Sequence, residues 1–173
     1  MKIISGKYKN RNLKSLADKS VRPTSALVKK SLFQILEPFD NKSILDLFAG
    51  TGSLGIESIS RGALKVTFVE KSKKVANVLL KNLNEICGND DCDVITSDTY
   101  KYLDVCGEKY DIIFADPPYE TINFIDIKRK IVKLLNYNGI FCMERRFKKD
   151  TYKDVRIKNY GRTQILIWQK TAK

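Results

Sequence analysis

Histidine is absent from this sequence of 173 residues. Without it, the chain lacks the side chain that most often acts as a general base near neutral pH and most often binds zinc. The four cysteines, Cys87, Cys92, Cys106 and Cys142, form no C-x-x-C pair. We therefore expect reduced thiols, no disulfide framework and no metal site. Any chemistry must use carboxylates, backbone groups and a cofactor.

Long apolar runs are missing as well. No stretch approaches the roughly 18 residues that a membrane span needs, and the N-terminal MKIISGKYKNR has no apolar segment behind its charges, unlike a signal peptide. We expect a cytoplasmic, monomeric protein with no membrane contact. The length predicts one domain over 1–173, with a basic arm or hairpin over 1–20 and a core that carries the chemistry over 21–173.

Positive and negative charges are unevenly distributed along the chain, whose net charge is +12. Residues 1–33 hold nine Lys and Arg against one Asp, an excess of +8. Residues 145–173 hold ten against two, again +8, whereas residues 34–144 hold 13 against 17 Asp and Glu, or −4. Basic flanks around an acidic centre favour a polyanionic partner that both ends contact.

Strand-like and helix-like patterns alternate between residues 43 and 143. The strand patterns cover 43–48, 65–69, 93–96, 110–115 and 140–143. The helix patterns cover 53–60, 72–88 and 124–135, and an earlier one runs from Pro23 to Pro38. Runs at 151–158 and 163–169 predict a closing hairpin. We expect an α/β Rossmann-like fold with a seven-stranded, mostly parallel sheet and antiparallel C-terminal strands.

The segment DLFAGTGSLGIE at 46–57 places a G-x-G-x-x-G between a predicted strand and a predicted helix. Loops in this context bind nucleotide cofactors at the start of the helix. Glu70 ends the next strand, twenty residues after Gly50, where a carboxylate can accept both hydroxyls of a ribose. NAD and S-adenosylmethionine both fit these features.

Asp46 separates the two cofactors. A dinucleotide would bring about two negative charges of a pyrophosphate close to this carboxylate, and unit charges about 4 Å apart interact by about 4 kcal/mol at an effective dielectric of about 20. S-adenosylmethionine has no phosphate, and its sulfonium and ammonium groups are attracted to a carboxylate. We therefore expect S-adenosylmethionine as the cofactor.

The segment DIIFADPPYE follows the predicted fourth strand. Two prolines fix φ near about −65° twice, so the Asp116 side chain and the neighbouring carbonyls point in set directions. The Asp116 carboxylate and the Pro117 carbonyl can hold both hydrogens of an exocyclic amine, while Tyr119 stacks on the base. Positioning and electrostatic stabilisation then supply the rate without histidine. The predicted catalytic residues are Asp116, Pro117, Pro118 and Tyr119.

Six segments together resemble one known family, the bacterial 16S rRNA guanine-N2 methyltransferases of the RsmD type. These segments are IISGKYKNRNL, RPTSALVKKSLFQIL, DLFAGTGSLGIE, FVEK, SDTYKYL and ADPPY. The resemblance runs from about residue 3 to the final strand. It implies a class I S-adenosylmethionine-dependent fold that methylates the N2 amine of one guanine in 16S rRNA, within a small-subunit assembly particle.

The resemblance also implies site residues. Glu70 would bind the ribose hydroxyls and Asp98 the adenine amine. The cofactor contacts would come from Asp46, Phe48, Ala49, Gly50, Thr51, Gly52, Glu70, Lys71, Ser97, Asp98 and Thr24. The RNA contacts would come from Lys7, Lys9, Arg11, Arg22, Arg145 and Arg146. One departure is the short, basic stretch over 144–152, which leaves little room for a helix and, with Lys148 and Lys149, could extend the RNA-binding face.

Other functions remain open at this point. An adenine-N6 methyltransferase acting on DNA or RNA uses similar loops, although a DNA enzyme usually needs a separate region that reads bases in the major groove. A glutamine methyltransferase acting on protein would not explain two basic flanks. A catalytically silent rRNA-binding assembly factor would not need an intact Asp116–Tyr119 segment. An NAD oxidoreductase is disfavoured by Asp46.

Overall fold

The computed structural model describes residues 1–15, 26–118 and 122–171. Its strands are β1 (Ser43–Leu47), β2 (Lys65–Glu70), β3 (Cys92–Thr96), β4 (Tyr110–Ala115), β5 (Leu135–Arg146), β6 (Val155–Tyr160) and β7 (Thr163–Gln169). Its helices are α1 (Ala26–Leu36), α2 (Ser53–Ser60), α3 (Lys73–Ile86), α4 (Thr99–Val105) and α5 (Phe124–Ile131). None of these helices combines the length and apolarity required to cross a membrane.

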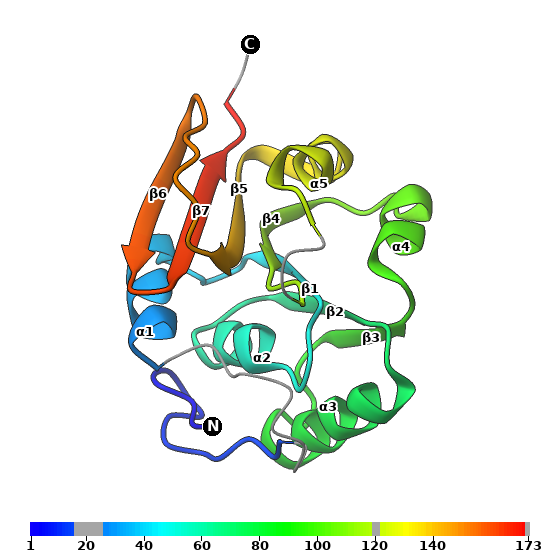
Figure 1. Ribbon diagram of the computed structural model, residues 1–173. Helices are drawn as coiled ribbons and strands as arrows, with labels where there is room; N and C mark the ends of the chain where they lie inside the picture. Colours follow the sequence, from blue (N-terminus) through cyan, green and yellow to red (C-terminus); the bar gives the residue numbers. More distant parts are fainter. Residues whose placement is uncertain (16–25, 119–121, 172–173) are drawn as a thin grey trace.

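The seven strands form one sheet in the order β3-β2-β1-β4-β5-β7-β6 (Figure 1). Strands β1 to β5 pair in parallel with one another, whereas β7 runs antiparallel to both β5 and β6. A mostly parallel sheet needs crossover helices to return the chain to the same edge. The predicted α/β fold with antiparallel C-terminal strands is confirmed.

Apolar side chains alternate between the two faces of the sheet. Ile44 of β1 packs in a buried cluster with residues of α1, α2 and α3. Leu45, one position on, packs in a second cluster with residues of α4 and α5. Because successive strand residues point to opposite faces, a central strand must be apolar on both sides. The helices therefore form two layers that enclose the sheet (Figure 1).

Helix α3 follows directly from local sequence. The Ser72 side chain accepts a hydrogen bond from the Val75 amide at 3.4 Å and caps the first turn. Leu79, Leu83 and Ile86 recur at helical spacing and are buried against the sheet. The predicted helix over 72–88 is confirmed to within a residue or two at each end.

Several elements differ from the prediction, among them β5, which spans Leu135–Arg146 and not only 140–143. Helix α4 was not predicted, because seven residues with one fully buried apolar side chain, Leu103, give too little periodicity to detect. Helix α5 ends at Ile131 and not at Leu135, whose buried side chain already belongs to β5. Strand β6 begins at Val155, later than the predicted 151, because residues 151–154 connect it to β5.

The described N-terminal segment, residues 1–15, folds back on itself. Lys2 and Asn12 form an antiparallel bridge, and the Ile3 amide donates to the Arg11 carbonyl at 3.0 Å. The side chains of Ile3 and Leu13 belong to the buried apolar cluster that also contains residues of α1 and α2. The predicted basic hairpin is thus a loop anchored by two apolar side chains and placed beside α2 (Figure 1).

Candidate functional site

The polar motifs meet at one edge of the sheet. In the parallel register, Leu47 lies between Val69 of β2 and Ala115 of β4. The residues that follow these three positions are the glycine-rich loop, Glu70 and Asp116, so they emerge from the sheet side by side. Ligands of open α/β sheets bind beyond the carboxyl ends of the strands, at this kind of edge.

The glycine-rich loop depends on left-handed backbone angles. Phe48, Gly50 and Gly52 have φ values of 58°, 56° and 90°. A Cβ atom added to Gly52 would lie 2.4 Å from Leu79 Cδ1, so only glycine fits both the angle and the space. The left-handed Phe48 was not predicted, because nothing in a phenylalanine signals that conformation.

Glu70 holds the loop in place. Its carboxylate accepts hydrogen bonds from the Gly50 amide at 3.0 Å and from the Ser72 amide at 2.8 Å, and so joins the loop to the start of α3. Among the described residues, the atom nearest to a Cβ atom added to Gly50 would be the Phe48 carbonyl oxygen, at 4.0 Å. This part of the chain therefore leaves space at Gly50 that a ligand can approach closely.

Asp46 lies below the loop and is 2% exposed. Its Oδ2 accepts a hydrogen bond from the Gly55 amide at 2.8 Å, at the start of α2. Burial raises the pKa of Asp46 to about 8; the Gly55 hydrogen bond opposes this rise, and the neighbouring Asp116 and Glu70 charges add to it. The Asp46 carboxyl thus lies close to two other carboxylates at this edge, where a bound cation would favour its ionised form and a phosphate would oppose it.

Lys71 follows the end of β2, and Asp98 lies two residues after the end of β3. The Asp98 side chain caps α4 by accepting from the Tyr100 and Lys101 amides at 3.0 and 3.4 Å. The Lys71 ammonium lies 3.3 Å from the other carboxylate oxygen and lowers the pKa of Asp98. Ser97 directly precedes Asp98, and its amide donates to the Glu70 carbonyl at 3.2 Å. The Asp98 carboxylate therefore already accepts hydrogen bonds from two backbone amides and contacts Lys71, whereas we expected it to bind the adenine amine.

The described part of the Asp-Pro-Pro-Tyr corner leads away from β4. Asp116 and Pro117 are half-buried and Pro118 is exposed. The Asp116 charge is close enough to Asp46 to raise its pKa, which places the corner beside the glycine-rich loop. Three predicted site residues lie outside the described ranges: Tyr119, Thr24 and Arg22.

The predicted RNA-binding residues of the N-terminal segment differ in their surroundings. Lys7 forms an ion pair with Asp90, and the Arg11 guanidinium donates to the Glu85 carbonyl. Lys9 is exposed. Both Lys7 and Arg11 contact the end of α3 or the turn after it, so their first role is to attach the segment to the domain.

Arg145 and Arg146 also differ from each other. Arg145 lies 2.9 Å from the Asp150 carboxylate and 3.0 Å from the Tyr152 hydroxyl, and its side chain is only 9% exposed. A guanidinium that is buried and hydrogen-bonded in this way has little surface for a phosphate. Arg146 is exposed. The two adjacent arginines therefore have different roles.

A family model described as Conserved hypothetical protein 95 matches residues 1–169. The chain belongs to this family. It is 42% identical over 123 residues to ribosomal RNA small subunit methyltransferase D from Haemophilus influenzae, covering 69% of this chain and 64% of that one. A relative of the same name from Buchnera aphidicola is 37% identical over 142 residues, covering 81% and 70%. The resemblance drawn from the sequence motifs is confirmed.

The fold is similar to that of solved structures. The structure of the Escherichia coli protein yhhF matches with a TM-score of 0.87 and 27% identity, and covers 100% of this chain and 99% of that one. By sequence, the chain spans 64% of the Haemophilus relative's own length. The structural match covers both chains almost completely, so the elements described above are shared with that structure.

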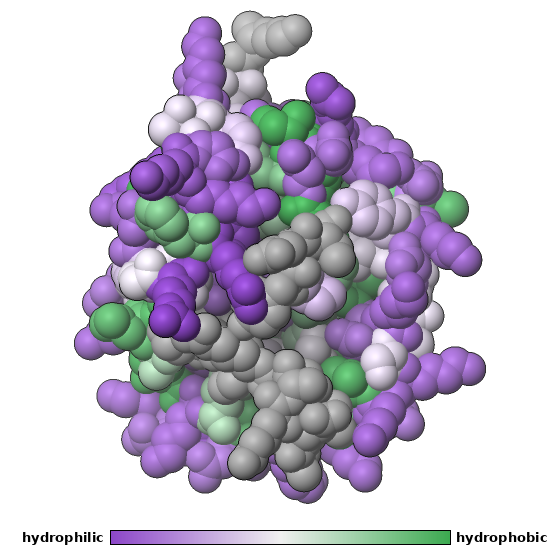
Figure 2. Space-filling view, viewed as in Figure 1, coloured by the Kyte–Doolittle hydropathy of each residue, from purple (hydrophilic) through white to green (hydrophobic). Residues whose placement is uncertain are grey.

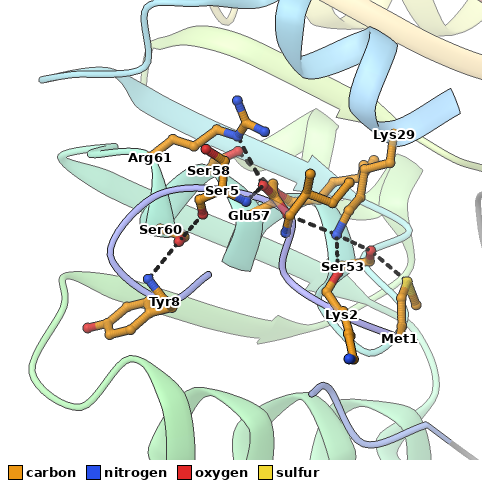
Figure 3. Close-up of polar contacts among 12 residues, drawn as sticks. Met1, Lys2, Ser5, Tyr8, Lys29, Ser53, Glu57, Ser58, Ser60 and Arg61 are labelled. Carbon is orange, nitrogen blue, oxygen red and sulfur yellow. Dashed lines mark hydrogen bonds and ion pairs between the residues drawn. The ribbon is translucent and has the colours of Figure 1, made fainter. Parts of the chain in front are cut away.

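Glu57 is a buried carboxylate with several polar partners, and the sequence analysis gave it no role. It is fully buried in α2, with Lys29 at 3.0 Å and Arg61 at 3.0 Å. The same carboxylate accepts from the Ile4 and Ser5 amides at 2.8 and 3.0 Å (Figure 3). Burial lowers the pKa of Lys29, and the Glu57 charge opposes that shift. One carboxylate thus joins α1, α2 and the N-terminal segment.

Asn82 makes a second connection that the sequence analysis missed. It is 1% exposed on α3. Its amide nitrogen donates to the Thr51 carbonyl at 2.9 Å and the Lys14 carbonyl at 3.0 Å, while its oxygen accepts from the Lys14 amide at 2.8 Å. The available signal was an asparagine on the apolar face of an amphipathic helix, since buried amides need partners.

Replacing Glu57 should destabilise the protein strongly. Glu57→Ala leaves Lys29 buried without its anion, leaves Arg61 with Glu37 alone and removes the acceptor of two backbone amides, so we expect a loss of about 3–5 kcal/mol in the free energy of unfolding. Glu57→Gln should lose less, because an oxygen acceptor remains. Urea denaturation measures the difference, with Glu85→Ala, at an exposed ion pair of α3, as a control that should change by less than about 1 kcal/mol. Equal stability of Glu57→Ala and wild type would contradict this.

Replacing Asn82 should loosen the glycine-rich loop and the end of the N-terminal segment together. Asn82→Ala removes three hydrogen bonds, each worth about 1 kcal/mol. We expect faster amide hydrogen exchange in peptides covering 46–56 and 1–15, by about tenfold or more, with the sheet unchanged. Asn77→Ala, at an exposed position of the same helix, is the matched control. Faster exchange in only one of the two peptides would show that Asn82 does not couple them.

Proposed function

We propose that this protein transfers a methyl group from S-adenosylmethionine to the exocyclic N2 amine of a guanine in 16S rRNA. The observation that carries this assignment is the gathering of Asp46, Glu70 and Asp116 around the glycine-rich loop, at the carboxyl edge of the sheet. Family membership supports it, since the relatives from Haemophilus influenzae and Buchnera aphidicola are named ribosomal RNA small subunit methyltransferase D.

The residues of the edge fit S-adenosylmethionine. The acidic group of side chains suits a molecule that has a sulfonium and an ammonium group and lacks phosphates. The space beside the Gly50 backbone, among the described residues, would let the cofactor approach closely. The Glu70 carboxylate, which now accepts backbone amides, would accept the ribose hydroxyls of the cofactor. Asp98 and Lys71 would line the adenine end. When bound, the cofactor supplies an electrophilic methyl carbon.

The Asp-Pro-Pro-Tyr corner would position the amine. The Asp116 carboxylate and the Pro117 carbonyl would accept its two N–H groups, which directs the nitrogen lone pair toward the cofactor side of the edge. As the nitrogen forms its new bond it gains positive charge, and the Asp116 carboxylate stabilises that charge. Tyr119 would stack on the guanine after it leaves its helix or loop. Neither histidine nor a metal ion is needed for this chemistry.

The basic flanks would bind the RNA. Exposed cations such as Lys9 and Arg146 belong to the flanks, each with an excess of +8, whereas the centre of the chain is acidic. Hydrophilic side chains dominate the face in Figure 2, including the side of the hairpin formed by β6 and β7. A monomer acting in the cytoplasm on a small-subunit assembly particle fits this arrangement.

Labelling decides between the alternative substrates. The protein is incubated with tritiated S-adenosylmethionine and small-subunit particles from a strain that lacks it, and the labelled base is mapped. We expect label on the N2 amine of a guanine in 16S rRNA. Label on an adenine N6 would favour the adenine methyltransferase, and binding without any transfer would favour the silent assembly factor.

Asp116 should be needed for transfer and not for cofactor binding. Asp116→Ala removes the acceptor that stabilises the charged nitrogen, and we expect kcat to fall by about 100- to 1,000-fold. The cofactor affinity, measured by calorimetry, should stay within about twofold. Asp126→Ala, at an exposed carboxylate of α5, should leave both unchanged. Equal losses of affinity and rate in Asp116→Ala would assign Asp116 to the cofactor.

Cofactor binding should strengthen as pH rises toward 8. With a pKa of about 8, Asp46 is mostly protonated at neutral pH in the empty protein, and a bound cation favours its charged form. The affinity should rise between pH 6 and about 8, by about tenfold for each unit by which binding lowers the pKa, and then level off. Calorimetry of wild type against Asp46→Asn isolates this contribution, because the variant cannot ionise here. Parallel pH profiles for the two proteins would rule out the role of Asp46.

A further inference from the structure

The connection between β5 and β6 begins at the edge that holds the proposed site. In the parallel register, Met143 of β5 lies beside Ala115 of β4, one residue before Asp116. Strand β5 ends at Arg146. Strand β5 thus continues three residues beyond the level of Ala115, or about 10 Å at about 3.3 Å per residue, and the residues that follow leave the sheet at the same edge as the Asp-Pro-Pro-Tyr corner. They begin with Phe147, Lys148 and Lys149, and all three are exposed.

The backbone of this connection is fixed by a buried glutamine. Gln164 of β7 is 2% exposed. Its amide nitrogen donates to the Lys148 carbonyl at 2.7 Å, and its oxygen accepts from the Lys148 amide at 3.1 Å. The Phe147 amide donates to the Arg162 carbonyl at 2.9 Å. The side chains of Phe147 and Lys148 are thus presented from a backbone that is held on both sides.

Arg145 provides a second anchor below the tip. Its Nε donates to Gln164 at 3.0 Å, and its guanidinium contacts Asp150 at 2.9 Å and the Tyr152 ring at 5.4 Å from the centroid. These contacts join the two ends of the connection. The tip formed by 146–149 is therefore a supported surface and contains three cations and one aromatic ring.

Phe147 has no evident structural reason to be aromatic. Its side chain is 47% exposed, and the two apolar clusters of the described residues form without it. A single exposed apolar residue is ordinary on a protein surface. This one, however, lies among Arg146, Lys148 and Lys149 at the edge where a base must be bound. A ring between cations is the arrangement that binds single-stranded nucleic acid by stacking and phosphate contacts together.

We infer that Phe147 stacks on an unpaired rRNA base next to the target guanine, while Arg146, Lys148 and Lys149 contact the flanking phosphates. Taking a base out of its stack exposes the face of its neighbour, and an aromatic ring on the protein can replace the lost contact. Since every base has a flat face, such stacking tolerates sequence variation. This role rests on the proposed function, and it places the substrate strand across the end of β5.

Kinetics with Phe147→Ala test the role. We expect the KM for small-subunit particles to rise about tenfold, with the cofactor affinity and the melting temperature unchanged, because the side chain is exposed and outside the core. Phe147→Tyr and Phe147→Trp should restore the KM. The matched control is Tyr137→Ala, since Tyr137 is 68% exposed near the start of the same strand, at the opposite edge of the sheet. An unchanged KM in Phe147→Ala, or an equal rise in Tyr137→Ala, would overturn the inference.

Fluorescence separates stacking from other contacts. The chain has one tryptophan, Trp168, so Phe147→Trp adds a single indole to a known background. A single-stranded RNA oligonucleotide should quench the added indole, and the quenching should weaken with salt as counterions are released. Without quenching, a higher KM on particles would point to a ribosomal protein as the partner and overturn the RNA role. If the oligonucleotide quenches the indole but the wild type transfers no methyl group, the proposed function is refuted while the contact between Phe147 and RNA stands. If the wild type transfers methyl groups but no quenching is seen, the inference about Phe147 is refuted and the proposed function stands.

Discussion

A fully buried carboxylate must be matched by cations and amides, and Glu57 draws these partners from three separate segments. Lys29 comes from α1, Arg61 follows α2, and two amides come from the N-terminal segment. Because α2 begins where the glycine-rich loop ends, this requirement fixes the N-terminal segment relative to the loop. Asn82 adds a direct connection from the loop to Lys14. The basic arm and the cofactor loop are therefore joined by direct polar contacts.

The distribution of charge along the chain now has a physical explanation. The acidic centre contains Asp46, Glu70 and Asp116, which meet where parallel strands end. The basic flanks lie outside it, in residues 1–33 and 145–173. A cationic small molecule and a polyanion can then bind at neighbouring places, because each finds a field of the opposite sign. Were both signs mixed at one place, each partner would meet repulsion as well as attraction.

The local sequence predicted most helices and strands, whereas the roles of individual polar side chains depend on contacts with residues far away along the chain. Strand β4 and helix α2 were predicted with the bounds that the structure has, since apolar runs and the glycines that flank α2 act within a few residues. The strand-end position of the glycine-rich loop also followed from the alternation of elements. Asn82 could not be given its role, because Thr51 is 31 residues away along the chain. Asp98 was predicted as an adenine contact, and its capping of α4 was missed together with that short helix.

The stretch ERRFKKD shows why charge alone does not identify a binding residue. Its four cations look equivalent in sequence, yet Arg145 is held by Asp150 and Gln164 and is 9% exposed. Its guanidinium supports the backbone from which Phe147 and Lys148 project. A buried cation contributes rigidity, and an exposed one contributes affinity that salt weakens. The neutral residue of the stretch, Phe147, then carries the more specific information, because an exposed ring among cations can stack on a base, whereas the cations can contact phosphates of any sequence.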